Sequence, residues 1–387
     1  MKNKSFDTYA GSWNMELKKY KLKKLLEIKN GKDHKALLNG KYPVYGSGGV
    51  IRYVNEYLYN KPSILLPRKG SLTNIQYVDV PFWTVDTTYY TEVNTKLVVP
   101  YYLYRYLNLL NLESLDSGTG VPSMTFDSYY NIVVEIPHLP IQERIAKVLT
   151  DIDSKISLNK TINKELEVMA KGLYDYWFVQ FDFPNEDGKP YKSSGGKMKF
   201  NSILKRDIPE GWEVKSINDF CKNYRGVSYD KSDLLTGPEE GVLVLRGNNI
   251  DGNTLVYDDN VAYVPPSFVE PEQKIKKHDI IMTMSSGSKE HVGKCTMFQS
   301  DSEHTYGAFM TKFTPDPECP FFAYRSMLSD FFKAKIKYIC GGTGINNLTN
   351  QTFDEILFPF PSKDVLKAFE KMLSPIYDKV GKTMMKY

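Results

Sequence analysis

A long stripe of apolar residues follows Pro140 and has the spacing of one face of a helix. Proline is favoured at the first helical position, and from there to residue 179 the chain contains no further proline and only one glycine, Gly172. About 40 residues at about 1.5 Å each predict a rod of about 60 Å. Lys155 and Asn159 interrupt the stripe. Its apolar members are Ile145, Val148, Ile152, Ile162, Leu166, Met169 and Leu173.

A second, shorter stripe near the C-terminus supplies a partner, because a long apolar seam needs a facing helix. Residues 362–387 place Phe369, Met372 and Ile376 at the same helical spacing. Pro375 lies within this stripe, and we expect it to kink or break the helix. The two stripes together predict a pair of packed helices.

Runs of β-branched and aromatic residues, divided by turn residues, precede each of the two helices. The first region has turn candidates at Gly46–Gly49 and at Arg68–Gly70, each after a strand-like run. Helices are expected at 101–111 and at 321–336. Both regions therefore predict mixed α and β units, and the polar, Gly- and Ser-rich residues 185–207 predict an exposed linker.

The two regions are copies of each other. The segment Gly118-Thr119-Gly120 aligns with Gly342-Thr343-Gly344, and the alignment continues without a gap into both helical stripes. A gapless apolar register of this length indicates an internal duplication. Apolar residues coincide at Met124 and Leu348, Ile132 and Ile356, Ile145 and Phe369, and Ile152 and Ile376.

Composition changes this picture little. The 387 residues are 41% hydrophobic and 13% aromatic, which suffices for two packed domains. The net charge of +4 permits a polyanionic partner without demanding one. The four cysteines are far apart, which argues against a disulfide framework or a zinc site and fits a reducing cytoplasm. We expect no secretory signal and no membrane span.

Catalytic signatures are missing from the sequence. Pro265-Pro266 is followed by Ser267, which does not fit an adenine methyltransferase motif. Residues 287–295 resemble a P-loop, but the glycine spacing is too long and Cys295 replaces the magnesium-binding Ser or Thr. The five histidines form no zinc-binding pair. Catalytic groups can still meet in space, but we expect a chain that is not catalytic by itself and holds no metal.

Several segments resemble specificity subunits of type I restriction–modification systems. EIPHLPIQERIAKVLTDID at 135–153 and YWFVQFDFP at 176–184 resemble the two ends of that family's central conserved helix. YPVYGSGG at 42–49 and LLPRKGSLTNIQYV at 65–78 resemble its first target-recognition domain, and IPEGWEVKSI at 208–217 resembles the entry to the second. The resemblance covers nearly the whole chain, in the family's order.

The resemblance implies an α+β fold in which two similar mixed α/β target-recognition domains are separated by long helices that pair as an antiparallel coiled coil. The second helix stops at Tyr387, the counterpart of Asn163, so either the pair is short or residues 1–15 complete it. The expected parts are residues 1–139 (first domain with an N-terminal extension), 140–184 (central helix), 185–207 (linker), 208–361 (second domain) and 362–387 (C-terminal helix).

The implied function is the reading of a bipartite double-stranded DNA target, one half by each domain. The helices would dock modification subunits, expected to be two, which methylate adenine with S-adenosylmethionine. Restriction subunits, which use ATP and magnesium, would join the complex. This chain would need no cofactor of its own and would act in the cytoplasm, away from membranes.

Candidate DNA contacts follow from side-chain chemistry at the turns. Arginine reads guanine and asparagine reads adenine, while lysine and serine mostly hold phosphate. Arg68, Lys69 and Arg246 lead, because each lies on a turn directly after an apolar strand. The full set is Ser47, Arg68, Lys69, Thr84, Thr87 and Thr119 in the first unit, and Arg225, Arg246, Asn248, Asn249, Ser285, Ser286, Lys289 and Lys294 in the second.

Plainer interpretations stay open at this stage. Any one of these side chains can be an ordinary solvated residue, and the Gly-Thr-Gly loops can be tight turns alone. The main rival is a duplicated scaffold protein that binds no DNA and associates through its helices. A nuclease or methyltransferase acting alone would need a catalytic motif. A specificity subunit of a system that only methylates its target would differ from one of a full restriction system in its partner subunits, and the sequence of this chain does not separate the two.

Overall fold

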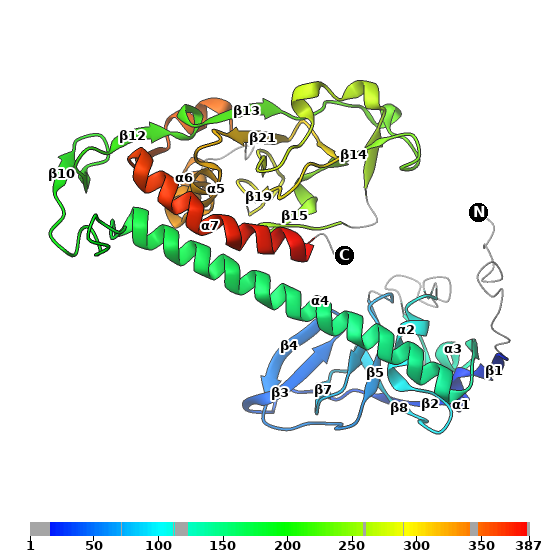
Figure 1. The fold of residues 1–387 in the computed structure, drawn as a ribbon. Coiled ribbons are helices and arrows are strands. Elements are labelled where there is room, and N and C mark those ends of the chain that lie inside the picture. The colour runs from blue at the N-terminus through cyan, green and yellow to red at the C-terminus, as the bar shows by residue number, and fades with distance from the viewer. Residues whose placement is uncertain are drawn as a thin grey trace. The chain divides into compact units, whose positions relative to one another are not determined.

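The computed structural model describes residues 16–70, 72–110, 112, 123–257, 261–288, 290–340 and 347–384. It divides into two compact units, Met1–Lys155 and Ile156–Tyr387, which we name the first and the second unit. Helix α4, Leu139–Tyr174, begins in the first unit and ends in the second (Figure 1). It continues as a π-helical turn at Asp175–Val179, close to the expected end of the long helix.

The described residues of the first unit form three small sheets and three short helices, besides the start of α4. A two-stranded sheet pairs β1 with β9, a four-stranded sheet has the order β2-β8-β5-β6, and a three-stranded sheet has the order β4-β3-β7. The elements are β1 (Lys18–Lys21), α1 (Leu22–Leu25), β2 (Leu26–Asn30), β3 (Asn39–Gly46), β4 (Gly49–Val54), β5 (Ser63–Pro67), β6 (Gln76–Val78), β7 (Trp83–Thr84), β8 (Thr88–Val93), α2 (Pro100–Leu107), α3 (Phe126–Tyr130) and β9 (Val133–Ile136).

The core of the first unit lies around β5, whose five residues are all buried. Ile64 and Leu66 of this strand belong to one apolar cluster with residues of α1, α2 and α3. The hydroxyl of Tyr129 donates a hydrogen bond to the carbonyl of Pro67 at 2.7 Å, which ties α3 to the end of β5. The strand end that precedes the basic turn is therefore held on a packed scaffold.

The second unit repeats this topology strand for strand. Its sheets have the orders β12-β22, β13-β21-β18-β19 and β17-β14-β20, and β14 pairs in parallel with β20 as β3 does with β7. The duplication predicted from the sequence is thus confirmed in three dimensions. The strands are β12 (Glu213–Ser216), β13 (Cys221–Arg225), β14 (Val242–Leu245), β17 (Ala262–Val264), β18 (Ile280–Thr283), β19 (Cys295–Met297), β20 (Thr305–Tyr306), β21 (Met310–Pro315) and β22 (Leu357–Phe360).

The second unit contains further elements besides these strands. They are the hairpins β10 (Met198–Asn201) with β11 (Arg206–Pro209) and β15 (Ile250–Asp251) with β16 (Thr254–Leu255), the helices α5 (Pro320–Leu328), α6 (Asp330–Ile339) and α7 (Lys363–Met384), and the 3₁₀ turns η4 (Ile217–Asp219), η5 (Lys231–Asp233), η6 (Gly247–Asn249), η7 (Pro266–Phe268), η8 (Pro271–Gln273) and η9 (Asn350–Asp354).

Two local expectations were wrong. The single helix expected at 321–336 is split at Ser329, which has extended backbone angles and caps α6 by accepting the N–H of Phe332 at 3.2 Å. The linker expected at 185–207 contains most of the β10–β11 hairpin, and Tyr191 stacks on Phe183 with ring centroids 4.6 Å apart. Serine as a cap and an aromatic stack account for these two departures.

Helix α7 packs antiparallel on the second half of α4. Near the end of α7, Thr383 Oγ1 donates to Asn163 Oδ1 at 2.5 Å, while near its start Phe369 packs on Tyr174 and Trp177. The pairing of the two helices is therefore confirmed for this part of α4. The helix does not end at Pro375, whose side chain is exposed.

The packed seam differs from the predicted one. Phe369 and Ile376 are buried, Leu166 and Leu173 pack against the core of the second unit, and Ile145 and Ile162 are half-buried. The other four predicted pairing residues are exposed, so their assignment to a helix pair within this chain was wrong. They are Val148 (58% exposed), Ile152 (47%), Met169 (56%) and Met372 (43%).

A change of packing face explains the exposed residues. In the first unit, α4 turns Gln142 and Asp153 toward its neighbours: Gln142 hydrogen-bonds Val99 N at 2.9 Å and Asp153 pairs with Arg105 at 3.3 Å. In the second unit, Ala170 and Tyr174 face the core. A uniform heptad seam predicts one partner helix along the whole length, whereas α4 packs on different structures at its two ends.

Candidate nucleic-acid interface

Three turns of the first unit converge at one end of its sheets. The carbonyl of Ser47, in the β3–β4 turn, accepts a hydrogen bond from the side chain of Asn74 after β5. Gln76 donates to the carbonyl of Gly46 at 3.0 Å. Val85, which follows β7, donates its N–H to the carbonyl of Tyr45 at 3.0 Å. The turns after β3, β5 and β7 therefore form one hydrogen-bonded cluster.

Arg68 holds the basic turn against the β7–β8 turn. Its backbone N–H donates to the carbonyl of Thr87 at 3.0 Å, and its Nη1 donates to the carbonyl of Asp86 at 3.3 Å. The guanidinium lies 6.0 Å from the ring centroid of Tyr89. Burial raises the pKa of Tyr89, and the Arg68 charge acts in the opposite direction. Lys69, the next residue, is exposed.

Glycine allows the backbone conformation of two of these turns. Gly49 has φ +115° and Gly70 has φ +93°, conformations that residues with a side chain rarely adopt. A Cβ atom at Gly70 would lie 3.7 Å from Ser47 Oγ. Ser47, Arg68, Lys69 and Thr87 are thus brought together, and their contact with DNA stays a prediction.

The second unit builds the same cluster with other side chains. Met284 and Ser285, after β18, donate their backbone N–H groups to the carbonyl of Phe309 at 2.9 and 3.3 Å. In the first unit, Arg68 and Lys69 donate in the same way to Thr87, at 3.0 and 3.4 Å. The counterpart of the Arg-Lys pair is therefore a Met-Ser pair.

A second pair of equivalent hydrogen bonds shows which position of the first unit corresponds to Arg246. Gly307 donates its N–H to the carbonyl of Leu245 at 2.9 Å, as Val85 does to Tyr45. Arg246, which follows Leu245, therefore takes the position of a glycine of the first unit. The two units therefore present a basic side chain at different points of the repeated scaffold.

Two predicted contacts were wrong because their side chains point inward. Thr84 is fully buried, and its hydroxyl donates to the carbonyl of Thr88 at 3.2 Å. Asn249 is 1% exposed: its Oδ1 accepts the N–H of Arg246 at 2.9 Å and its Nδ2 donates to the carbonyl of Val256 at 3.1 Å. Both side chains already hold the turns together, so neither reaches a ligand.

The other predicted contacts of the second unit lie near the same strand ends. Arg225 is exposed at the end of β13, and Asn248 is exposed in η6. Lys294 comes just before β19, and its Nζ lies 3.3 Å from His291 Nδ1. Ser286 follows Ser285 and is half-buried. Thr119 and Lys289 lie outside the described residues.

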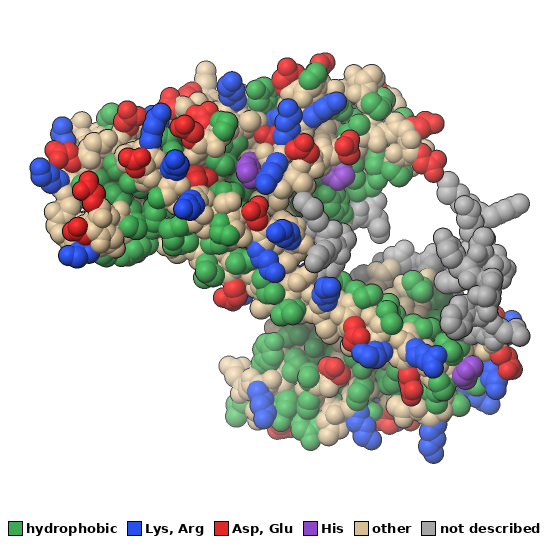
Figure 2. Space-filling model, in the orientation of Figure 1, with side chains coloured by type: hydrophobic (Ala, Val, Ile, Leu, Met, Phe, Trp, Pro, Cys, Tyr) green, Lys and Arg blue, Asp and Glu red, His purple; other side chains and the backbone are tan. Residues whose placement is uncertain are grey.

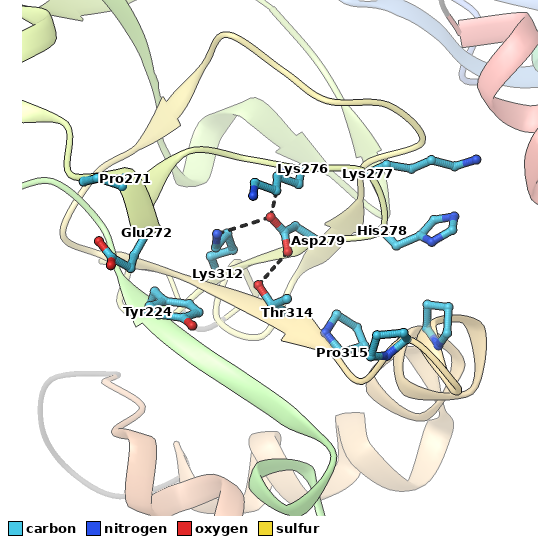
Figure 3. Close-up of a pocket in the computed structure, with 12 residues that line it drawn as sticks. Tyr224, Pro271, Glu272, Lys276, Lys277, His278, Asp279, Lys312, Thr314 and Pro315 are labelled. Atoms are coloured by element: carbon cyan, nitrogen blue, oxygen red, sulfur yellow. Dashed lines mark hydrogen bonds and ion pairs between the residues drawn. The ribbon is translucent and has the colours of Figure 1, made fainter. Parts of the chain in front are cut away.

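A pocket of about 490 Å³ lies at the opposite end of β18 (Figure 3). Asp279, just before the strand, pairs with Lys312 at 3.2 Å and accepts a hydrogen bond from Thr314 at 2.6 Å. Lys312 also donates to the carbonyl of Lys274 at 2.9 Å. The buried polar groups of the pocket thus form ion pairs and hydrogen bonds with one another. The pocket lies apart from the turn cluster.

The visible surface carries charges of both signs. Figure 2 shows Lys and Arg side chains interspersed with Asp and Glu, without a large region of one sign. Among the described residues, no group of three or more His, Cys, Asp or Glu is placed to hold a metal ion, and no helix is long and apolar enough to cross a membrane.

The family of the chain follows from this duplicated architecture and a direct comparison. Residues 14–168 and 209–382 each match the type I restriction modification DNA specificity domain. The chain belongs to this family and carries two copies of its domain. The resemblance inferred from the sequence is therefore confirmed.

Particular relatives are the specificity subunits of named type I restriction enzymes. The chain is 26% identical to the MjaVIII subunit of Methanocaldococcus jannaschii, over 83% of this chain and 73% of that protein. It is 33% identical to the StySPI subunit of Salmonella potsdam over 46% of this chain, and that match spans only 38% of the relative's length. The type I S subunit of M. genitalium has the same fold, with a TM-score of 0.57 at 14% identity over 96% of this chain and 94% of that one.

Proposed function

We propose that this chain is the DNA-reading specificity subunit of a type I restriction–modification complex. The observation that carries the proposal is the turn cluster, built twice on one scaffold with different side chains. Each unit reads one half of a bipartite target, and the unread spacer lies between the halves. In this proposal, side chains on these turns contact base edges in the major groove, and lysine and serine around them hold phosphates.

The chemistry belongs to partner subunits. Modification subunits, two by the symmetry of the duplication, bind S-adenosylmethionine and methylate adenine, and restriction subunits use ATP and magnesium. This chain is not catalytic and holds no cofactor. The exposed apolar residues Val148 and Val168 on α4 support a role of this helix in docking a partner. The complex acts in the cytoplasm, where the buried free thiols, among them Cys221 and Cys295, stay reduced.

Methylome sequencing tests the proposal. A host expresses the chain with its partner modification subunit, and the methylated motif is compared for the wild type, Arg68→Ala and Lys96→Ala. Lys96 is an exposed lysine beyond the far end of β8, so it serves as the matched control. We expect a split motif with methyladenine in both halves, degraded in one half by Arg68→Ala and unchanged by Lys96→Ala. Absence of new methylation, with the partner folded and bound, would refute DNA reading and favour a scaffold.

A further inference from the structure

The turn between β20 and β21 presents an aromatic side chain on a fixed backbone. Met310 donates its N–H to the carbonyl of Gly307 at 2.9 Å, which closes a tight turn over residues 307–310. Phe309 lies within this turn and is 71% exposed. Its carbonyl accepts the N–H groups of Met284 and Ser285, and Gly226 donates to the carbonyl of Met310 at 3.2 Å. The backbone below the ring is therefore tied to both neighbouring strand ends.

An exposed phenylalanine alone is unremarkable on a protein surface. Its position is informative, because the first unit carries the same turn at residues 85–88. There Thr88 donates to the carbonyl of Val85 at 3.1 Å, and the carbonyl of Thr87 receives the two N–H groups that follow β5. Thr87 and Phe309 are therefore counterparts, and Asp86 corresponds to Ala308.

The two turns differ completely in chemistry. The first presents a carboxylate and a hydroxyl, which accept and donate hydrogen bonds at base edges. The second presents a methyl group and a phenyl ring, which form no conventional hydrogen bond and contact apolar groups instead. In the major groove the apolar group that distinguishes one base from the others is the C5-methyl of thymine.

We infer that Phe309 determines specificity in the second unit by contacting the C5-methyl group of a thymine in its half of the target. This inference rests on the proposed function. Polar residues lie on the neighbouring strand ends: Arg225 is exposed at the end of β13, and Ser285, after β18, donates its backbone N–H to the carbonyl of Phe309. They supply hydrogen bonds to phosphates or neighbouring bases, while the ring selects the methyl group.

The test compares thymine with deoxyuridine, which lacks only the methyl group. Methylome sequencing first identifies the motif made by the wild-type chain with its modification subunit. Duplexes are then made in which each thymine of the second half is replaced in turn by deoxyuridine, and binding by the same complex is measured. The wild type, Phe309→Ala and Phe200→Ala are compared. Phe200 is 64% exposed on the β10 hairpin of the same unit and is the matched control.

We expect one replacement to weaken wild-type binding by roughly fourfold, the effect of one methyl-sized group leaving a contact. Phe309→Ala should bind thymine and deoxyuridine equally at that position, while Phe200→Ala should behave like the wild type. The methylome of Phe309→Ala should accept other bases at that position alone.

The outcomes separate the inference from the proposed function. If the wild-type chain directs no methylation, the proposed function fails. If the motif is found but its second half lacks thymine, or wild type and Phe309→Ala lose equal affinity with deoxyuridine, the role of Phe309 is refuted. If Phe309→Ala weakens assembly with the modification subunit without DNA, the ring is a protein contact instead.

Discussion

Arg325 on α5 and Glu167 on α4 form an ion pair inside the second unit, with Nη1 and Oε2 2.8 Å apart. The Arg325 side chain is 4% exposed and that of Glu167 is 23% exposed. Arg325 Nη1 also lies 3.4 Å from the hydroxyl of Tyr377 on α7. Burial raises the pKa of Glu167, and attraction to Arg325 opposes that rise. The pair therefore joins three helices at the cost of desolvating two charges.

Replacing one partner of this pair should lower the unfolding free energy far more than replacing both. Arg325→Ala leaves a largely buried carboxylate without its counter-charge, and we expect a loss of about 3 kcal/mol in unfolding free energy. The double variant Arg325→Met, Glu167→Leu should recover most of that loss, because an apolar pair of similar size removes the desolvation cost. Urea unfolding of the three proteins measures both. Equal losses in the single and double variants would contradict this account.

Glu370 should make the second unit less stable as the pH rises. Its carboxylate accepts the N–H groups of Phe321 at 3.1 Å and Phe322 at 2.8 Å in the first turn of α5. Burial nevertheless raises the pKa of Glu370 from 4.5 to about 7. Between these values the folded state binds more protons than the unfolded state, so stability falls through this window and the loss is complete above the folded pKa.

The measurement for Glu370 is the urea midpoint at about pH 5 and about pH 8, for the wild type and Glu370→Gln. The amide is nearly isosteric but does not titrate. The stability of Glu370→Gln should therefore decrease less between the two pH values than that of the wild type. An unchanged pH dependence in Glu370→Gln would assign the effect to other groups.

Replacing Lys69 and replacing Arg68 should affect DNA binding in different ways. Lys69 is exposed, and a phosphate contact predicts that Lys69→Ala weakens binding to all sequences alike and lowers the salt slope by about 1. Arg68 is held by its neighbours, so Arg68→Ala should instead relax one base position, at a cost of about 1–3 kcal/mol for the preferred base. Binding titrations at several salt concentrations distinguish the two. A sequence-selective loss in Lys69→Ala would reverse the assignment.

Asn249 tests the corrected role of a residue first predicted to contact DNA. Because its side chain makes two buried hydrogen bonds to backbone groups, Asn249→Ala should cost about 1–3 kcal/mol of stability. The methylated motif should stay the same in the folded fraction. A change of motif without a loss of stability would restore the original prediction.

The larger organisation was predictable because it rests on periodic patterns. Apolar spacing predicted the long helix, and the coincidence of Met124 with Leu348 predicted the duplication, which the hydrogen bonds after β5 and β18 reproduce. The convergence of three turns was not predictable, since it depends on sheet order. Thr84, at the end of β7, and Asn249, in η6, were misassigned because a polar residue near a strand end points outward or inward according to turn geometry, which sequence spacing does not show.

The sequence alone does not identify Phe309 as a candidate contact, for a related reason. A phenylalanine in a β-rich segment is usually a core residue. The gapless alignment also sets Thr87 on Thr311, a buried strand residue, whereas the hydrogen bonds make Phe309 its counterpart. The chain between this turn and the Gly-Thr-Gly segment differs in length between the two copies, so only the three-dimensional register identifies the corresponding residues.

Substitution of one glycine in each unit should disturb the turn cluster of that unit alone. A Cβ atom at Gly31 would lie 2.1 Å from the carbonyl oxygen of Val85, and one at Gly226 would lie 2.2 Å from that of Gly307. Such contacts force the backbone to shift, at a cost of about 1–3 kcal/mol. Gly31→Ala should therefore displace the turn with Thr87, and Gly226→Ala the turn with Phe309.

Methylome sequencing of both glycine variants measures the effect on each half of the target. Gly31→Ala should degrade the half read by the first unit and Gly226→Ala the other half, because each turn belongs to one unit only. Gly188→Ala is a control, since a Cβ there meets open space although its φ of +72° adds some strain. If either interface glycine variant degraded both halves equally while the protein stayed folded, the two units would not read DNA independently.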